Sequence, residues 1–433
     1  MEAGFVVLGL VQGSLAGLNA LGLVLLWRTT RVVNLAQPAI GLVGGVLTGM
    51  LVASSGWTFW WAAPVGIGVS ALLGFASERL VMARLAEVPR TVPMVATIGL
   101  AALFQALQTG IPFAFGGRLP SYDVDIGVEV FVFPVLLKGP HLLALAALPV
   151  AVGGLWWFTH RTRVGAAAVA AGQDLERAQT LGVHAGFVRS VAWTIAGALS
   201  GVAGVLSIRV LGFSLGDGVA ATVVLLALAP AVLAGLRSLP ATAAASLAVG
   251  VGYQYALIEA PTAGAADVFL AAVLVVALAV HRRPLERAAR TARTSSWAAA
   301  ATPPPLPRVV RQDPVWRRLT VVAAVVAGVV AAAPPLWLSP SADVRYGTSA
   351  AFVIAAIAVA AAWMFSGEVA LGHWGIAALG ATVTHAVPGP LAGRVLVGVA
   401  VGAAAGVVLA VVARRRGALA AAVAGVAIAV AAP

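Results

Sequence analysis

Residues 27–45 read WRTTRVVNLAQPAIGLVGG, and a related stretch at residues 363–381 reads WMFSGEVALGHWGIAALGA. In each stretch an apolar helix ends, a short polar segment follows, and a second apolar run begins with small residues. Leu35, Ile40 and Gly44 fall in register with the residues 336 positions later, which are Leu371, Ile376 and Gly380. The repetition predicts two related membrane units in one polypeptide, an arrangement found in many proteins that form a path through the bilayer.

The composition is that of a protein embedded in a lipid bilayer. Hydrophobic residues make up 61% of the 433 residues and charged residues only 10%, whereas about a quarter of the residues in soluble domains are charged. We therefore expect an all-α, polytopic transmembrane helical bundle, with about nine spans in the first unit and about five in a partial second unit. Apolar runs long enough to cross the membrane include residues 4–26, 91–116, 141–158, 219–236 and 240–258.

The net charge of +12 is explained by arginines that lie between the apolar runs. Residues 117–139 instead hold Asp123, Asp125 and Glu129. Because positive charge is retained on the cytoplasmic side, we assign the arginine stretches to the cytoplasm of a multi-pass cell-membrane protein, with the N-terminus outside. The pattern argues against a nucleic-acid partner, which a basic patch on one face would indicate. The arginine stretches are 28–31, 79–90, 161–189 and 282–318.

Three parts are expected along the chain. Residues 1–281 form the first membrane unit, residues 282–318 a basic, proline-rich cytoplasmic linker, and residues 319–433 a partial second membrane unit. Proline-rich segments are stiff and extended, so the linker is either a solvated tether or a basic anchor to anionic lipid head groups. The second unit matches only the opening part of the first, which indicates either a fragment, the reading that we favour, or a degenerate copy.

The longest internal loop of the first unit, residues 162–184, reads TRVGAAAVAAGQDLERAQTLGVH. Its alanine-rich composition predicts one short cytoplasmic helix over residues 166–181, which Gly182 ends. The small residues Ala171, Ala178 and Gly182 would let the groove of a partner approach closely.

This loop, with Arg161 before it, resembles the coupling-loop signature of the Liv-type branched-chain amino acid ABC transporter permeases. The resemblance covers residues 5–280, and residues 367–373 are similar to the opening motif of the partner permease, so the chain resembles both permeases fused, with the second cut short. The residues that match the coupling-loop positions, and would contact an ATPase, are Gly165, Ala171, Asp174, Ala178 and Gly182.

The resemblance implies a permease component that moves branched-chain or related amino acids inward by alternating access. It also implies partners: ATPase subunits on the cytoplasmic side, an external solute-binding protein, and a second permease chain if the second unit is incomplete. The chain has no Walker motif, and its single lysine, Lys138, lies on the predicted outer side, so ATP hydrolysis is expected on separate subunits. We expect no enzymatic activity and no cofactor.

Polar residues at the breaks between apolar runs are the candidates for the translocation path. They are Asn34 and Gln37 in the first unit and Glu368 and His373 at the matching break in the second. The first break departs from the family motif, since histidine, glycine and glutamate are replaced by Gln37, Pro38 and Ala39. Polar residues inside the runs either join helices or line the path; these are Asn19, Gln105, Gln108 and Gln254.

Other functions are weighed against this one. The same architecture serves urea, short amides or simple sugars, and the sequence does not choose among these solutes. An ion-driven secondary transporter needs carboxylates in mid-membrane, which the first unit lacks except near a predicted outer loop. A membrane enzyme or a metal site needs clustered acidic residues and histidines, and the six histidines are scattered. A non-transporting scaffold remains if the second unit is degenerate.

Overall fold

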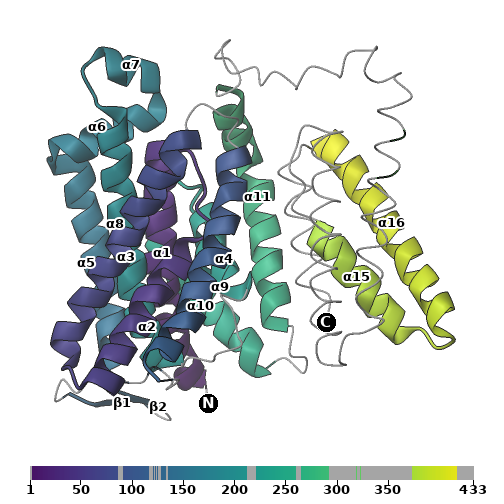
Figure 1. Cartoon of the computed structure of the whole chain (residues 1–433), viewed down its shortest axis with the longest axis horizontal. Coiled ribbons are helices and arrows are strands. Elements are labelled where there is room, and N and C mark those ends of the chain that lie inside the picture. Colours follow the sequence, from purple (N-terminus) through teal and green to yellow (C-terminus); the bar gives the residue numbers. More distant parts are fainter. Residues whose placement is uncertain are drawn as a thin grey trace. The chain divides into compact units, whose positions relative to one another are not determined.

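The computed structural model describes residues 2–85, 91–116, 120, 122, 124, 128–132, 135–211, 221–259, 265–291, 318, 322 and 373–416. The chain divides into two compact units, one reaching residue 292 and the other within residues 293–425, and each is described by itself. Both consist of packed helices, which confirms the predicted all-α membrane fold (Figure 1).

Within the described part of the first unit, seven helices are long and apolar enough to cross a membrane. Two further apolar helices, α9 and the first part of α11, are shorter than these seven. α11 also continues through Thr291, so the predicted linker begins as a helix. The seven long helices are α1 (Glu2–Thr30), α2 (Gln37–Ser55), α3 (Phe59–Leu80, followed by the short helix η1, Met82–Leu85), α4 (Thr91–Ala114), α5 (Gly139–Arg161), α8 (Ala185–Leu211) and α10 (Leu239–Glu259), and the shorter ones are α9 (Ala221–Leu233) and α11 (Ala265–Thr291).

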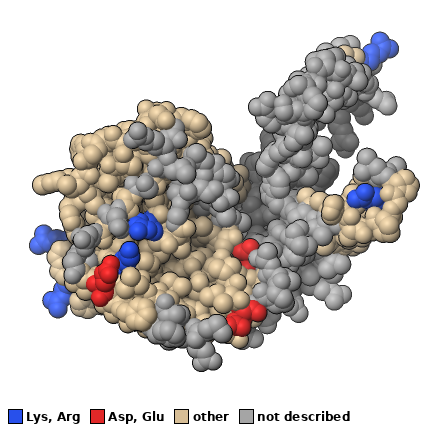
Figure 2. All heavy atoms as spheres, turned by 90° about the horizontal axis from the view of Figure 1, so that it is seen from below, with Lys and Arg blue, Asp and Glu red and all other residues tan. Residues whose placement is uncertain are grey.

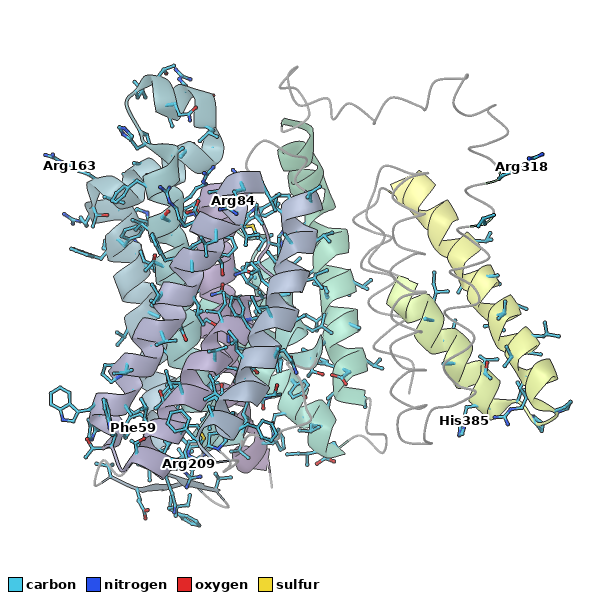
Figure 3. The ribbon with its side chains drawn as sticks, in the orientation of Figure 1. Phe59, Arg84, Arg163, Arg209, Arg318 and His385 are labelled. Atoms are coloured by element: carbon cyan, nitrogen blue, oxygen red, sulfur yellow. The ribbon has the colours of Figure 1, made fainter. Side chains whose placement is uncertain are left out.

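The first unit has two chemically different ends (Figure 3). Arg84 and Arg163 lie at one, the arginine end, together with the short helices α6 (Arg163–Gln173) and α7 (Leu175–Thr180). Phe59 and Arg209 lie at the other, the hairpin end, with the antiparallel strands β1 (Val130–Val132) and β2 (Val135–Leu137). Seen from the hairpin end, most of the described surface is uncharged (Figure 2). The arginine stretches of the first unit therefore gather at one end, as the charge rule requires.

Helix α2 lies at the centre of the first unit and contacts α1, α3, α4 and α8. Glycines let the backbones of its neighbours approach closely. A Cβ atom added to Gly204 of α8 would collide with the carbonyl of Gly41, and one added to Gly66 of α3 would collide with the carbonyl of Gly44 and the hydroxyl of Thr48. Thr48 Oγ1 also donates to Gly44 O at 2.9 Å. We call this contact of Gly44, Thr48 and Gly66 the α2–α3 notch.

At the hairpin end, Pro120 and Tyr122 of the connection between α4 and α5 pack on the bundle. Pro120 packs on Gly49 of α2, and the Tyr122 hydroxyl donates to the carbonyl of Val205 in α8. The Tyr122 ring stacks on Phe59 of α3 with ring centroids 5.4 Å apart. Burial raises the pKa of the Tyr122 phenol, an effect that nearby Arg209 partly offsets. The phenol therefore stays protonated and keeps its bond to α8 at neutral pH.

In the second unit the described helices are α15 (His373–Ala386) and α16 (Leu391–Arg416), which pack against each other. Their contact repeats the α2–α3 notch. Thr384 Oγ1 donates to Gly380 O at 2.8 Å, and a Cβ atom added to Gly398 of α16 would collide with that hydroxyl and that carbonyl. Arg394 then caps α15 by donating from Nε to Thr384 O at 2.8 Å. Gly380 and Thr384 keep the 336-residue spacing from Gly44 and Thr48, whereas Gly398 lies 332 residues after Gly66.

The α2–α8 contact yields a stability prediction. We expect Gly204→Ala to lower the free energy of unfolding by about 1–3 kcal/mol, because the added methyl group has no space beside the Gly41 carbonyl. Thermal denaturation of the purified chain in detergent measures the change. Gly153→Ala in α5 is the matched control, since nothing lies within 4 Å of its Cβ position. Equal midpoints for the two variants would contradict the close approach.

Candidate functional site: the coupling segment and the polar break

The α6–α7 segment, residues 163–180, follows a sharp change of direction after α5. Thr162 has extended backbone geometry and caps α6, because its Oγ1 accepts a hydrogen bond of 3.0 Å from Gly165 N. Gly165 packs directly on the carbonyl of Phe158, where a Cβ atom would collide. This candidate residue therefore sets the angle at which α6 leaves the end of α5.

The structure divides the segment into two helices, so the prediction of one continuous helix over residues 166–181 was wrong. Asp174 interrupts it with extended backbone geometry and accepts a hydrogen bond of 3.0 Å from Arg177 N, as the N-cap of α7. Aspartate favours this cap position over a helix interior because its carboxylate satisfies a free backbone N–H group. Gly182 ends α7 with a φ of +85°, as predicted, and its N–H donates to Gln179 O at 2.9 Å.

Ala171 and Ala178 are buried, so their small side chains admit neighbouring parts of the first unit. Helix α6 packs against α1, α5 and α8, and α7 packs against α6 and α8. What the segment presents outward is apolar and larger: the side chain of Leu181 is 80% exposed, and Leu175 is also exposed. A partner at the arginine end would therefore meet Leu181 beside Gly182, rather than the alanines.

Helix α6 is seated on the end of α1, a contact that sequence reasoning missed. A Cβ atom at Gly172 would collide with the carbonyl of Arg28. Arg31 Nε donates to Gly172 O at 2.8 Å, and its guanidinium lies 5.9 Å from the centre of the Trp27 ring. Arg31 itself has a φ of +58°, a strained backbone conformation for a residue with a side chain. The α1–α2 break is thus fixed directly to the segment.

Asn34 and Gln37 lie just beyond this seat and are fully buried. Asn34 Oδ1 accepts from Ala36 N at 3.0 Å, which turns the chain into α2, and Pro38 fits the first turn of that helix. Asn34 Nδ2 donates to Gln37 Oε1 at 3.0 Å, and Gln37 Nε2 donates to Ala196 O of α8 at 2.7 Å. In this conformation the two path candidates join the α1–α2 break to α8.

The network continues through Ser200 of α8, whose hydroxyl lies within hydrogen-bond distance of Gln37 O and of Asn19 Oδ1 of α1 and donates its single proton to one of them. From α4, Gln108 Nε2 donates to Ala39 O at 3.0 Å. These side chains link α1, α2, α4 and α8 across the bilayer interior, where an unpaired polar group is costly.

Less is described of the two path candidates in the second unit. Glu368 lies outside the described residues. His373 is the first residue of α15, the position that Gln37 occupies in α2, and only its backbone is described. Among the described residues, no group of three or more histidines and carboxylates could hold a metal ion.

The hydrogen bonds at the α1–α2 break, the polar break of this unit, give a second stability prediction. Gln37→Leu should lower the free energy of unfolding by about 1–3 kcal/mol, because the buried carbonyl of Ala196 and the amide of Asn34 lose their partner. Ser14→Ala is the control, since the Ser14 hydroxyl bonds only to Leu10 O within its own helix. Denaturation midpoints in detergent measure both; an unchanged midpoint for Gln37→Leu would contradict the network.

Comparison with known proteins places this architecture. Residues 5–278 match the family model of the permease component of branched-chain amino acid transport systems. The chain is 23% identical over 260 residues to the high-affinity branched-chain amino acid transport system permease protein LivH of Escherichia coli K12, an alignment that covers 56% of this chain and 82% of LivH. It is 24% identical over 272 residues to the corresponding permease protein BraD of Pseudomonas aeruginosa, covering 57% and 83% of the two chains.

A more distant organism also has a relative. The probable branched-chain amino acid transport permease protein LivH of Methanocaldococcus jannaschii is 28% identical over 204 residues, covering 45% of this chain and 62% of the relative. No solved structure matches the chain significantly. The family match ends before the second unit begins.

Proposed function

The chain belongs to the family of branched-chain amino acid transport permeases, and we propose that it forms part of the membrane path through which an ABC importer takes up leucine, isoleucine and valine. It is a multi-pass membrane permease component rather than an enzyme. The observation that carries the substrate class is the family match over residues 5–278, which spans every described helix of the first unit except the first residues of α1 and the end of α11.

Cytoplasmic ATPase subunits are the partners proposed for the α6–α7 segment. The segment lies at the arginine end, which the charge rule assigns to the cytoplasm. It presents the exposed Leu181 beside Gly182, and through Gly172 and Arg31 it contacts the α1–α2 break. A push from the ATPases would thus reach the centre of the bundle and drive alternating access. The N-terminus and the β1–β2 hairpin are then outside, where a solute-binding protein delivers the amino acid.

The second unit is proposed to be a partial second permease unit fused to the first. Its support is the repeated notch: Gly380, Thr384 and Gly398 make the contacts that Gly44, Thr48 and Gly66 make between α2 and α3. On this proposal His373 and Glu368 occupy the polar break of the second unit.

Docking of the ATPase subunits gives a third prediction. Leu181→Asp should reduce co-purification of the ATPase subunits at least about fivefold, since a charge replaces the exposed apolar side chain at the centre of the contact. The denaturation midpoint should stay unchanged because Leu181 is 80% exposed. Leu136→Asp, the same change on the hairpin, is the control and should leave co-purification intact. Full ATPase stoichiometry with Leu181→Asp would refute the docking assignment.

Uptake tests the solute. Proteoliposomes that hold the chain with its ATPase subunits should accumulate radiolabelled leucine, isoleucine or valine when the binding protein and internal ATP are both present. Urea, acetamide and ribose serve as competing solutes at excess concentration. If one competing solute abolished accumulation of the amino acids, the assignment would move to that solute. If none of the three amino acids accumulated in an ATP-dependent manner, the importer assignment would be contradicted.

A further inference from the structure

Glu78 is a buried carboxylate that neither the family resemblance nor the polar break accounts for. It lies in the last turn of α3 at the arginine end, and its side chain is 1% exposed. Ser190 Oγ donates to Glu78 Oε2 at 2.5 Å, and Arg189 Nε lies 3.3 Å from Glu78 Oε1 as an ion pair. Both partners belong to α8, the first long helix after the α6–α7 segment, which we also call the coupling segment.

The ion pair is a poor candidate for a purely stabilising contact. α3 and α8 already touch along their backbones, since Cβ atoms at Gly74 or Gly197 would collide with the carbonyls of Trp193 and Ser70. A buried ion pair costs desolvation energy that its mutual attraction often only balances, and well-packed apolar residues hold helices together as firmly. What the pair adds is direction: the carboxylate accepts from two adjacent residues of α8 and so prevents the two helices from sliding past each other.

The position of the pair connects it with the coupling segment. α7 ends at Thr180, α8 begins at Ala185, and Arg189 and Ser190 occupy the opening turns of α8. Force on the second half of the segment therefore acts on α8 beside Glu78. The first half, α6, acts on α1 through Gly172 and Arg31. Two separate attachments lead from one segment into the bundle.

We propose that Glu78 is a positioning residue of the transport cycle, which makes α3 follow α8 when the coupling segment moves. Because α3 also holds α2 through the α2–α3 notch, α2, α3 and α8 then move together as one body. The inference rests on the proposed function, since it needs ATPase subunits that move the segment. Without the charge, the ATPases would still dock and hydrolyse ATP, but less of their movement would reach α3.

The test measures two things separately: whether the ATPase subunits still bind the chain, and how many ATP molecules are hydrolysed per amino acid imported. Glu78→Gln keeps the size of the side chain and an oxygen acceptor for Ser190 but removes the charge. In proteoliposomes containing the full chain and its ATPase subunits, we expect normal co-purification and ATP hydrolysis, and at least about a tenfold rise in the number of ATP molecules hydrolysed per amino acid imported. Glu78→Asp should restore part of the coupling, and Ser77→Ala is the matched control, because the Ser77 hydroxyl bonds only to Leu73 O of its own helix.

A second variant keeps the inference falsifiable if Glu78→Gln does not fold. Arg189→Gln removes the cation of the pair instead, and the amide that replaces it can still donate a hydrogen bond to the Glu78 carboxylate, which also keeps its bond from Ser190. It should raise the same ratio, and the double variant should be no worse than either single one, because both act on one interaction. An unchanged ratio in both single variants, or loss of the fold in both, would overturn the positioning role. Lack of uptake by the unaltered chain would instead count against the proposed function itself.

Discussion

The close backbone approach of α2 to α3 and α8 is the constraint on which the first unit depends. Glycines at the contacts leave no room for even one methyl group, so the backbones of the three helices lie directly against one another. In a bilayer, where lipid is as apolar as the side chains, such close packing takes over the role that the hydrophobic effect has in water. Every other feature of the unit is arranged around this central helix.

Close packing determines where polar groups can lie. α2 begins inside the bundle, so the backbone groups at its start need partners that water cannot supply. Asn34 Oδ1 accepts from Ala36 N, and the Ser200 hydroxyl lies against Gln37 O. Gln37 Nε2 and Ser200 also connect the start of α2 to α8 and α1. Because Gly172 and Arg31 attach α6 to the end of α1, the α6–α7 segment is in direct contact with the α1–α2 break.

Much of the fold could be predicted from the sequence, because apolar length and arginine placement are local signals. The spans, the cap at Gly182 and the repeat of Gly44 at Gly380 are of this kind. The break of the segment at Asp174 was also a local signal, but the alanine-rich surroundings obscured it. The contact of α6 with the end of α1, which is made at Gly172, could not be predicted. It joins residues that lie far apart in the sequence. The burial of Glu78 beside Arg189 could not be predicted either, because in the sequence Glu78 looks like a solvated charge at a helix end.

The central claim is that the α6–α7 segment is the surface on which the ATPase subunits dock, and one cross-linking measurement tests it directly. The chain contains no cysteine, so Leu181→Cys introduces a unique attachment point for a photoactivated cross-linker. The account predicts a cross-linked product of this chain with an ATPase subunit, which mass spectrometry identifies, and no such product from Leu136→Cys on the hairpin. A product from the hairpin position and none from Leu181→Cys would contradict the account.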